Sequence, residues 1–356
     1  MTPAELSRTV LHAVRRAVDE DALRASVPAR VRVERTRPGG SGDYACAVAL
    51  QLAGDAGLPA LEVARILRER VAAEPGIGRV EVTGPGFLSF TLDAPATGDR
   101  AVLDAVREQG SAYGHGDALR DEEVRLHHAP EVRAAVAADA VRRLLAAQGA
   151  RVRVGCEEGP GDVEWSRLGV TVDAYGTTPA AVTVIRAMPA HATAAELLER
   201  LGADAVRWGL LRPASHDRAP LGDDLLVQGQ ANPLFRVRYA YARTRALTRG
   251  AAALGFTSAP DAAPYEDAAR PLLVLLADHP GVLLAAARHR APDRVARQLE
   301  AVAHAFFDFH DSCPPLPSGD EKPSAAHRSR LALAEAAGTV LAGGLSLLGI
   351  SAPEHL

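Results

Sequence analysis

The stretch Asn232–Arg243 reads Asn-Pro-Leu-Phe-Arg-Val-Arg-Tyr-Ala-Tyr-Ala-Arg and opens the most regular part of a 356-residue sequence. Asn232 is a favoured residue for capping a helix, and Pro233 suits the first helical position. Apolar and small side chains then recur at helical spacing on one side, at Val237, Ala240, Tyr241, Thr244 and Leu247. The pattern predicts a helix over 233–249 with one buried face.

The other side of this helix carries arginines. Arg238, Arg245 and Arg249 are spaced so that they stack opposite the apolar face. A row of arginines suits phosphate contacts, and a neighbouring aromatic such as Tyr239 suits stacking on a base. The alternative is an ordinary solvated face, because only Lys322 among the 40 basic residues is a lysine and arginine is therefore common throughout.

The C-terminal part around this helix, from residue 193 onward, is predicted to be almost entirely helical. Thr193 and Glu196 form a capping box that starts the first helix. Helical periodicity covers 194–212, 266–290, 292–310 and 325–348. Polar, proline-bearing connections at 257–264 and 314–324 separate the helices. Residues 193–356 are therefore expected to form an all-helical bundle.

The N-terminal part, residues 1–95, has a different pattern. A helix begins after Thr2, and further helices are expected at 44–53 and 60–72. Short strands are expected at 31–34, 79–83 and 87–92, the last two being joined by the turn sequence Gly84-Pro85-Gly86. This mixture predicts a small α+β domain.

The middle part, residues 96–192, is predicted to contain less regular secondary structure. A strand at 124–127, a helix at 134–148 and a strand beginning near Val152 follow one another. A strand–helix–strand order favours one parallel βαβ unit, a short Rossmann-like α/β segment. The fold prediction is thus a multi-domain, mainly helical chain with an α+β N-terminal domain, an α/β remnant and an all-α C-terminal bundle.

Composition limits the classes of function. The net charge is −4, so nucleic acid would have to bind at a local basic face, and a general coat for DNA is not expected. The three cysteines, Cys46, Cys156 and Cys313, form no CxxC pair, so neither a structural zinc site nor any other metal site is predicted. Their odd, sparse count fits a reducing cytosol, so a cytoplasmic location is expected. No run of apolar residues approaches 18, so no membrane span is expected.

Three segments, in order, resemble arginyl-tRNA synthetases. The first combines Gly42-Asp43-Tyr44-Ala45 with the stretch 84–90, and it is similar to that family's N-terminal domain, which contacts the tRNA elbow. The second combines 202–207 with 232–243 and resembles the start of the anticodon-binding, or DALR-type, helical domain. The third is 330–354, which is similar to the family's last helix and tail. The resemblance covers about 1–95 and 193–356.

The central signatures of that family do not occur in this sequence. A class I synthetase uses an HxGH motif after its first catalytic strand, where the histidines stabilise charge on the ATP phosphates. Here the corresponding strand is followed by Glu131-Val132-Arg133-Ala134-Ala135. The stretch 183–188, at the place of the lysine-rich KMSKS loop, holds only Arg186 as a cation. The sequence therefore resembles actinobacterial synthetase-related anticodon-binding proteins that lack most of the catalytic domain, and neither a catalytic residue nor an ATP cofactor is predicted.

The resemblance implies which residues would contact tRNA. They lie in the strand near the elbow-binding end, along the arginine-bearing helix and at the C-terminus: Phe87, Ser89, Asn232, Phe235, Arg238, Tyr239, Arg243, Arg245, Arg249 and Leu356. Serine at position 89 departs from the family's asparagine, so it offers one hydrogen bond where the amide offers two. The adjacent His127 and His128 point to opposite faces of a strand and are not expected to act together.

The predicted function is therefore tRNA binding, with an arginine tRNA favoured, by a chain that is not a complete ligase. Two alternatives remain open at this stage. One is residual arginine–tRNA ligase or aminoacyl-transfer activity, which family resemblance alone would suggest. The other is a scaffold that binds a synthetase, a transferase or a biosynthetic partner through its helical bundle.

Overall fold

The computed structural model describes residues 3–36, 42–74, 77–92, 95–158, 163–177 and 182–356. The chain divides into two compact units, Met1–Asp104 and Ala105–Leu356. The division falls within helix α4 (Pro95–Gln109). The boundary predicted at residue 192 lies inside the second unit, where the α/β segment and the helical bundle pack together.

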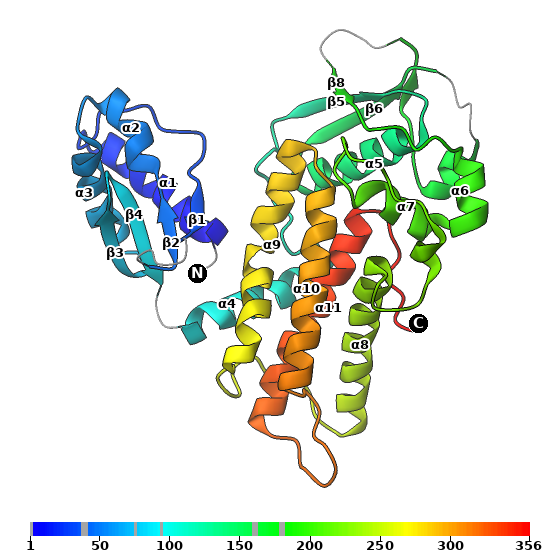
Figure 1. Ribbon diagram of the computed structural model, residues 1–356. Helices are drawn as coiled ribbons and strands as arrows, with labels where there is room; N and C mark the ends of the chain where they lie inside the picture. Colours follow the sequence, from blue (N-terminus) through cyan, green and yellow to red (C-terminus); the bar gives the residue numbers. More distant parts are fainter. Residues whose placement is uncertain (1–2, 37–41, 75–76, 93–94, 159–162, 178–181) are drawn as a thin grey trace. The chain divides into compact units, whose positions relative to one another are not determined.

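The described residues of the first unit form a four-stranded antiparallel sheet packed against helices (Figure 1). The strands β1 (Val33–Arg35), β2 (Tyr44–Cys46), β3 (Ile77–Thr83) and β4 (Phe87–Leu92) lie in the order β1-β2-β4-β3. The helices are α1 (Pro3–Asp19), α2 (Val48–Ala56) and α3 (Ala60–Val71). Side chains of α1, α3 and β4 such as Leu6, Leu67 and Phe90 are fully buried between them. The predicted α+β character is confirmed, while the cap proposed at Thr2 lies outside the described residues.

One prediction in this unit is wrong. The stretch 44–53 was expected to be a helix, but Tyr44–Cys46 forms β2, and α2 begins only at Val48. The strand is imposed by its partners, because Tyr44 and Cys46 pair with Phe90 and Leu88 of β4 and with β1 on the other side. Gly42 allows this approach, since its φ is +77° and a Cβ there would lie 2.7 Å from the carbonyl oxygen of Phe90.

The second unit begins with a parallel sheet. Strands β5 (Glu123–His128), β6 (Arg151–Cys156), β7 (Ala174–Tyr175) and β8 (Thr183–Ile185) lie in the order β7-β6-β5-β8, and every pairing is parallel. Helix α5 (Val132–Ala147) connects β5 to β6 and packs on the sheet. The predicted strand–helix–strand unit is therefore observed, with two short strands added at its edges.

The helical part of this unit is a bundle (Figure 1). Its long helices are α8 (Pro233–Ala253), α9 (Arg270–His289), α10 (Asp293–Ser312) and α11 (Ala325–Leu347). Helix α11 packs against α8, α9 and α10, and α10 also contacts α8 and α9. Buried Leu247, Leu276, Phe306 and Leu341 supply apolar side chains from all four helices. The all-helical C-terminal prediction is confirmed.

Two details differ from the sequence prediction. The helix expected over 194–212 is two helices, α6 (Ala194–Leu201) and α7 (Ala203–Leu211), because Gly202 adopts a φ of +75° that ends the first. The stretch Asp267–His289 reaches the length and a mean hydropathy of 1.3 that suit a membrane span, which the sequence reasoning did not expect. Its α9 portion packs against α5, α10 and α11, so it contributes to the bundle.

Candidate functional site

Asn232 caps the N-terminus of α8. Its side-chain oxygen accepts hydrogen bonds from the backbone N–H groups of Leu234 and Phe235, at 3.0 and 3.3 Å. Its amide nitrogen donates to the carbonyl oxygens of Leu225 and Val227, at 2.8 and 3.0 Å. Asn232 is 5% exposed. The structure thus places this predicted contact residue inside, where it joins the preceding loop to the helix.

An aromatic column lies on the exposed side of α8. The rings of Phe235 and Tyr239 are stacked with centroids 5.7 Å apart and planes 5° from parallel. Tyr239 also stacks on Phe307 of α10, at 5.6 Å. Tyr239 remains 43% exposed, so this column presents an aromatic face to solvent. The sequence predicted Phe235 and Tyr239 but missed Phe307, because its register against α8 depends on how α10 packs.

The predicted arginines share one surface, and the C-terminal tail lies along it. Arg245 Nε is 3.1 Å from one carboxylate oxygen of Glu354, and Arg249 Nη1 is 3.7 Å from the other. Arg249 also approaches His355 Nδ1 at 3.5 Å. Arg238 donates to the Ser351 hydroxyl at 3.2 Å. The stripe is therefore confirmed as a surface feature, but residues 351–355 of the same chain already contact it.

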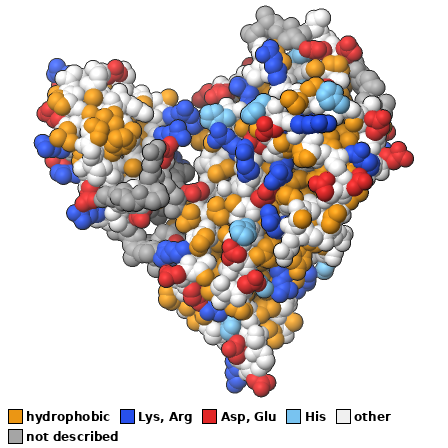
Figure 2. Space-filling model, in the orientation of Figure 1, with side chains coloured by type: hydrophobic (Ala, Val, Ile, Leu, Met, Phe, Trp, Pro, Cys, Tyr) orange, Lys and Arg blue, Asp and Glu red, His pale blue; other side chains and the backbone are white. Residues whose placement is uncertain are grey.

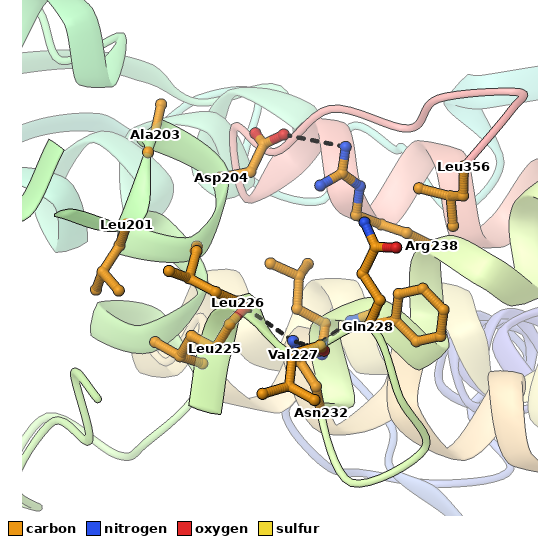
Figure 3. Close-up of a pocket in the computed structure, with 14 residues that line it drawn as sticks. Leu201, Ala203, Asp204, Leu225, Leu226, Val227, Gln228, Asn232, Arg238 and Leu356 are labelled. Carbon is orange, nitrogen blue, oxygen red and sulfur yellow. Dashed lines mark hydrogen bonds and ion pairs between the residues drawn. The ribbon is translucent and has the colours of Figure 1, made fainter. Parts of the chain in front are cut away.

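A pocket of about 340 Å³ opens beside the start of α8 (Figure 3). It is lined by the beginning of α7, by the loop ahead of α8, and by Phe235, Arg238 and the last residue, Leu356. Asp204 lies in its wall, 3.5 Å from Arg238, and accepts a hydrogen bond from the backbone N–H of Ser351 at 3.0 Å. Leu356 is 54% exposed. An aromatic edge, a cation and apolar side chains therefore meet in one concave place.

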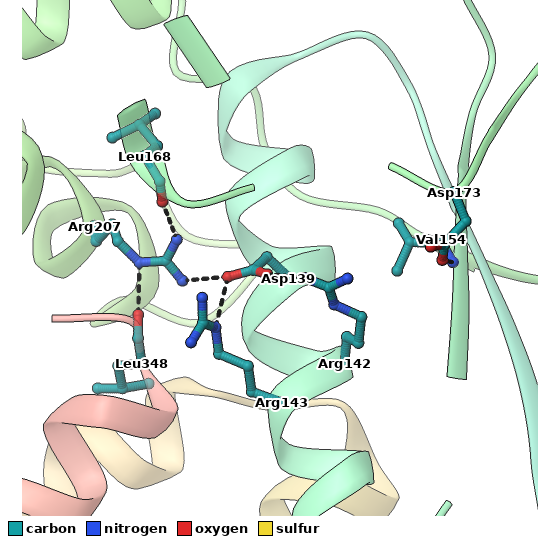
Figure 4. A network of polar contacts seen from close by, with 8 residues as sticks. All are labelled: Asp139, Arg142, Arg143, Val154, Leu168, Asp173, Arg207 and Leu348. Atoms are coloured by element: carbon teal, nitrogen blue, oxygen red, sulfur yellow. Dashed lines mark hydrogen bonds and ion pairs between the residues drawn. The ribbon is translucent and has the colours of Figure 1, made fainter. Parts of the chain in front are cut away.

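A buried ion-pair network holds Leu348, the residue at the end of α11 from which the tail continues (Figure 4). Arg207 of α7 lies 2.8 Å from Asp139 of α5 and donates to the carbonyl oxygen of Leu348 at 2.7 Å. Burial raises the pKa of Asp139, but Arg207, Arg143 and Arg142 outweigh burial and hold this pKa below its ordinary value. The network thus joins α5 of the α/β segment to α7 and to the C-terminal end of α11.

The remaining predicted contacts on α8 and in the first unit are placed differently. Arg243 is exposed and its guanidinium lies 3.3 Å from His310 Nε2. In the first unit, Phe87 is 37% exposed at the start of β4. Ser89 is only 4% exposed, and its hydroxyl shares a hydrogen bond with that of Thr83 at 2.9 Å. Of the two residues predicted on this strand, Phe87 alone is presented to solvent.

The two adjacent histidines are both interior. His127 is 3% exposed with Nε2 3.2 Å from the Gly176 carbonyl oxygen, and His128 is fully buried beside Trp165. Burial lowers the pKa of His128. Within the described ranges, no group of three or more histidine, cysteine or carboxylate side chains could hold a metal ion.

Two family descriptions match this chain. Residues 4–92 match the arginyl tRNA synthetase N terminal domain, and residues 237–356 match the DALR anticodon binding domain. The two matches lie at opposite ends of the chain and in the order in which the sequence resemblance was found. The chain is related to arginyl-tRNA synthetases.

Relatives extend over the whole of this synthetase-related chain. It is 27% identical to the arginine–tRNA ligases of Frankia alni and Kineococcus radiotolerans, in alignments that cover each chain completely. The first alignment spans 554 positions, well beyond the 356 residues present here, so a substantial part of that relative faces gaps. Both relatives are therefore longer than this chain.

Solved structures show the same fold. The arginyl-tRNA synthetase of Thermus thermophilus superposes with a TM-score of 0.70 at 15% identity, with both chains fully covered. The synthetase of Plasmodium falciparum gives a TM-score of 0.65 at 9% identity over 99% of each chain. The synthetase-related chain therefore has the arginyl-tRNA synthetase fold at low sequence identity.

Proposed function

We propose that this protein binds tRNA, with an arginine tRNA as the favoured partner, through the outward face of α8. One observation carries the proposal: α8 holds a row of surface arginines, an exposed stacked aromatic column and one wall of a pocket. Single-stranded nucleic acid is held by base stacking on aromatic rings and by cations along its backbone. The matches to synthetase domains at both ends support tRNA over other RNAs.

Electrostatics support a local site. Basic and acidic side chains are interspersed over the visible face of the helical bundle (Figure 2), in keeping with a net charge of −4. Affinity for RNA would then come from a few arginines, and it would fall steeply with added salt as counterions are released less favourably. The α8 face has the arginines needed for such contacts.

The second part of the proposal is that the chain is not a complete arginine–tRNA ligase and uses no ATP. The sequence contains no HxGH motif, and its single lysine, Lys322, lies far from the place of a KMSKS loop. Electrostatic stabilisation of the reacting phosphates needs such groups at fixed positions. An equilibrium ATP–pyrophosphate exchange assay with arginine and tRNA present is expected to give no signal. Arginine-dependent exchange would favour the ligase alternative.

The relationship to arginyl-tRNA synthetases also supports a cytoplasmic setting, where tRNA is found. Co-purification of the protein with a synthetase after nuclease treatment would support the scaffold alternative.

The binding proposal is tested with a panel of tRNA transcripts over a salt series. Arg245→Ala with Arg249→Ala is expected to weaken binding and to reduce the slope of log K against log salt by about 0.7–0.9 for each phosphate that these arginines neutralise. A matched control is Arg120→Ala with Arg167→Ala, since these exposed arginines also pair locally, with Asp117 and Glu164. Equal weakening in both double variants would reject the α8 face as the RNA site.

A further inference from the structure

The last six residues of the chain lie across the face that is proposed to bind RNA. After α11 ends at Leu347, Leu348 and Ile350 are buried, at 0% and 4% exposure. From Ser351 onward the chain has no regular structure and runs along α8. The tail therefore has a fixed root and an exposed end, and the end carries the contacts with the arginines.

In the tail, the carboxylate of one residue contacts two arginines of α8. The Glu354 carboxylate has one oxygen 3.1 Å from Arg245 and the other 3.7 Å from Arg249. Two guanidinium groups one helical turn apart thus share a single anion, which is also how arginines engage a phosphate.

We infer that Arg245 and Arg249 form a phosphate subsite that Glu354 of the chain's own tail occupies, so that RNA must displace the tail to reach it. This inference rests on the proposed tRNA binding. The tail is an internal competitor: it lowers affinity for any polyanion and releases the two arginines only when a better anion is offered.

The strength of the tail contact fits such exchange. The side chains of Arg245, Arg249 and Glu354 are 42%, 44% and 47% exposed. Ion pairs this exposed contribute little, and salt weakens them further. A flexible carboxylate can therefore be replaced by a phosphate without disturbing the buried root at Leu348 and Ile350.

Displacement would also open the pocket beside α8. Leu356 at the end of the tail lines that pocket together with Phe235 and Arg238 (Figure 3). Ser351, where the tail begins, is held by hydrogen bonds to Asp204 and Arg238. Movement of the tail beyond Ser351 would free the arginines and expose the aromatic edge of Phe235 at the same time.

The test compares Glu354→Gln with wild type in tRNA binding at several salt concentrations. The isosteric amide removes the charge, so affinity is expected to rise about two- to tenfold at low salt, and this gain is expected to shrink as salt screens the wild-type pairs. Glu123→Gln is the matched control, because Glu123 on β5 pairs with exposed Arg151 at 3.1 Å and its substitution changes net charge equally. The control is expected to leave affinity within about twofold of wild type.

A second comparison separates competition from a general charge effect. In the background of Arg245→Ala with Arg249→Ala, Glu354→Gln is expected to give no gain, since the groups it releases are gone.

The outcomes distinguish the two proposals. If wild type binds tRNA but Glu354→Gln binds no more tightly, or gains equally without the two arginines, the tail is not a competitor and the binding function stands. If neither wild type nor the tail variants bind tRNA, both proposals are overturned.

Discussion

Two sets of arginines in the second unit differ in what holds them. Arg133 and Arg207 are each 1% exposed, and their guanidinium groups are surrounded by acceptors. Arg133 donates to carbonyl oxygens at Leu210, Met188, Pro213, Ala214 and Asp217. Arg245 and Arg249 on α8 are partly exposed and share one carboxylate of the tail.

The same residue type has different roles in the two sets because its surroundings differ. A buried guanidinium must be fully hydrogen-bonded, because leaving it unpaired costs several kcal/mol. Its partners are therefore fixed, and it serves to join elements. An exposed guanidinium changes partners at little cost in free energy. The interior arginines stabilise the fold, while those on α8 are free to exchange an internal anion for an external one.

The largest loss of stability is expected when the carboxylate paired with the interior Arg207 is removed. Asp139→Asn removes the only carboxylate that Arg207 pairs with among the described residues. We expect a loss of about 3–5 kcal/mol in the free energy of unfolding, because a buried cation is left uncompensated. Urea unfolding measures it, and Asp117→Asn, which breaks an exposed pair with Arg120, is the control. A loss below about 1 kcal/mol for Asp139→Asn would remove the distinction between the two sets.

The next largest effect on stability is expected from His279, a buried histidine. His279 of α9 is 1% exposed, and burial with a smaller contribution from His115 lowers its pKa to about 4. The unfolded chain therefore binds more protons between pH 6.5 and about 4, so stability rises with pH over that range, by about 3 kcal/mol in total. His279→Leu is expected to flatten this dependence in urea unfolding. The same slope in the variant would show that His279 is not its source, and exposed His289→Gln is the control.

A smaller effect is expected on the α8 surface itself. Tyr239→Ala removes the middle ring of the stacked column, and we expect tRNA binding to weaken by about 1–3 kcal/mol if a base stacks there. Tyr175→Ala, at a tyrosine that is 48% exposed on β7, controls for removal of an exposed ring. Filter binding or fluorescence anisotropy measures both. Comparable weakening in the two variants would place the stacking surface elsewhere.

The smallest effect on stability is expected from the two exposed arginines of α8. Arg245→Ala with Arg249→Ala is expected to change the free energy of unfolding by less than about 0.5 kcal/mol, since the pairs with Glu354 are exposed. Thermal or urea unfolding measures this change beside that of Asp139→Asn. A loss of about 2 kcal/mol or more would mean that the tail contact stabilises the fold and that its arginines are structural.

Much of the fold could be predicted from the sequence because it is local. The capping box at Thr193 and the apolar face of α8 were both confirmed. The stretch at Tyr44–Cys46 was mispredicted because its strand depends on pairing with β4, which is distant in sequence. The break at Gly202 was also missed, because a glycine within a helical pattern does not by itself reveal its φ.

For the site, the sequence identified a row of arginines and aromatics on one helix, since helical spacing fixes which side chains share a face. It could not separate Asn232, which caps the helix from within, from Tyr239, which remains exposed. Nor could it pair Arg245 and Arg249 with Glu354, more than a hundred residues away. Periodicity is a property of neighbouring residues, whereas burial and ion pairing depend on which distant segments the folded chain brings together. Residue spacing is therefore enough to predict the helices and their faces, whereas the folded chain alone shows which arginines are buried in ion pairs and which contact the tail.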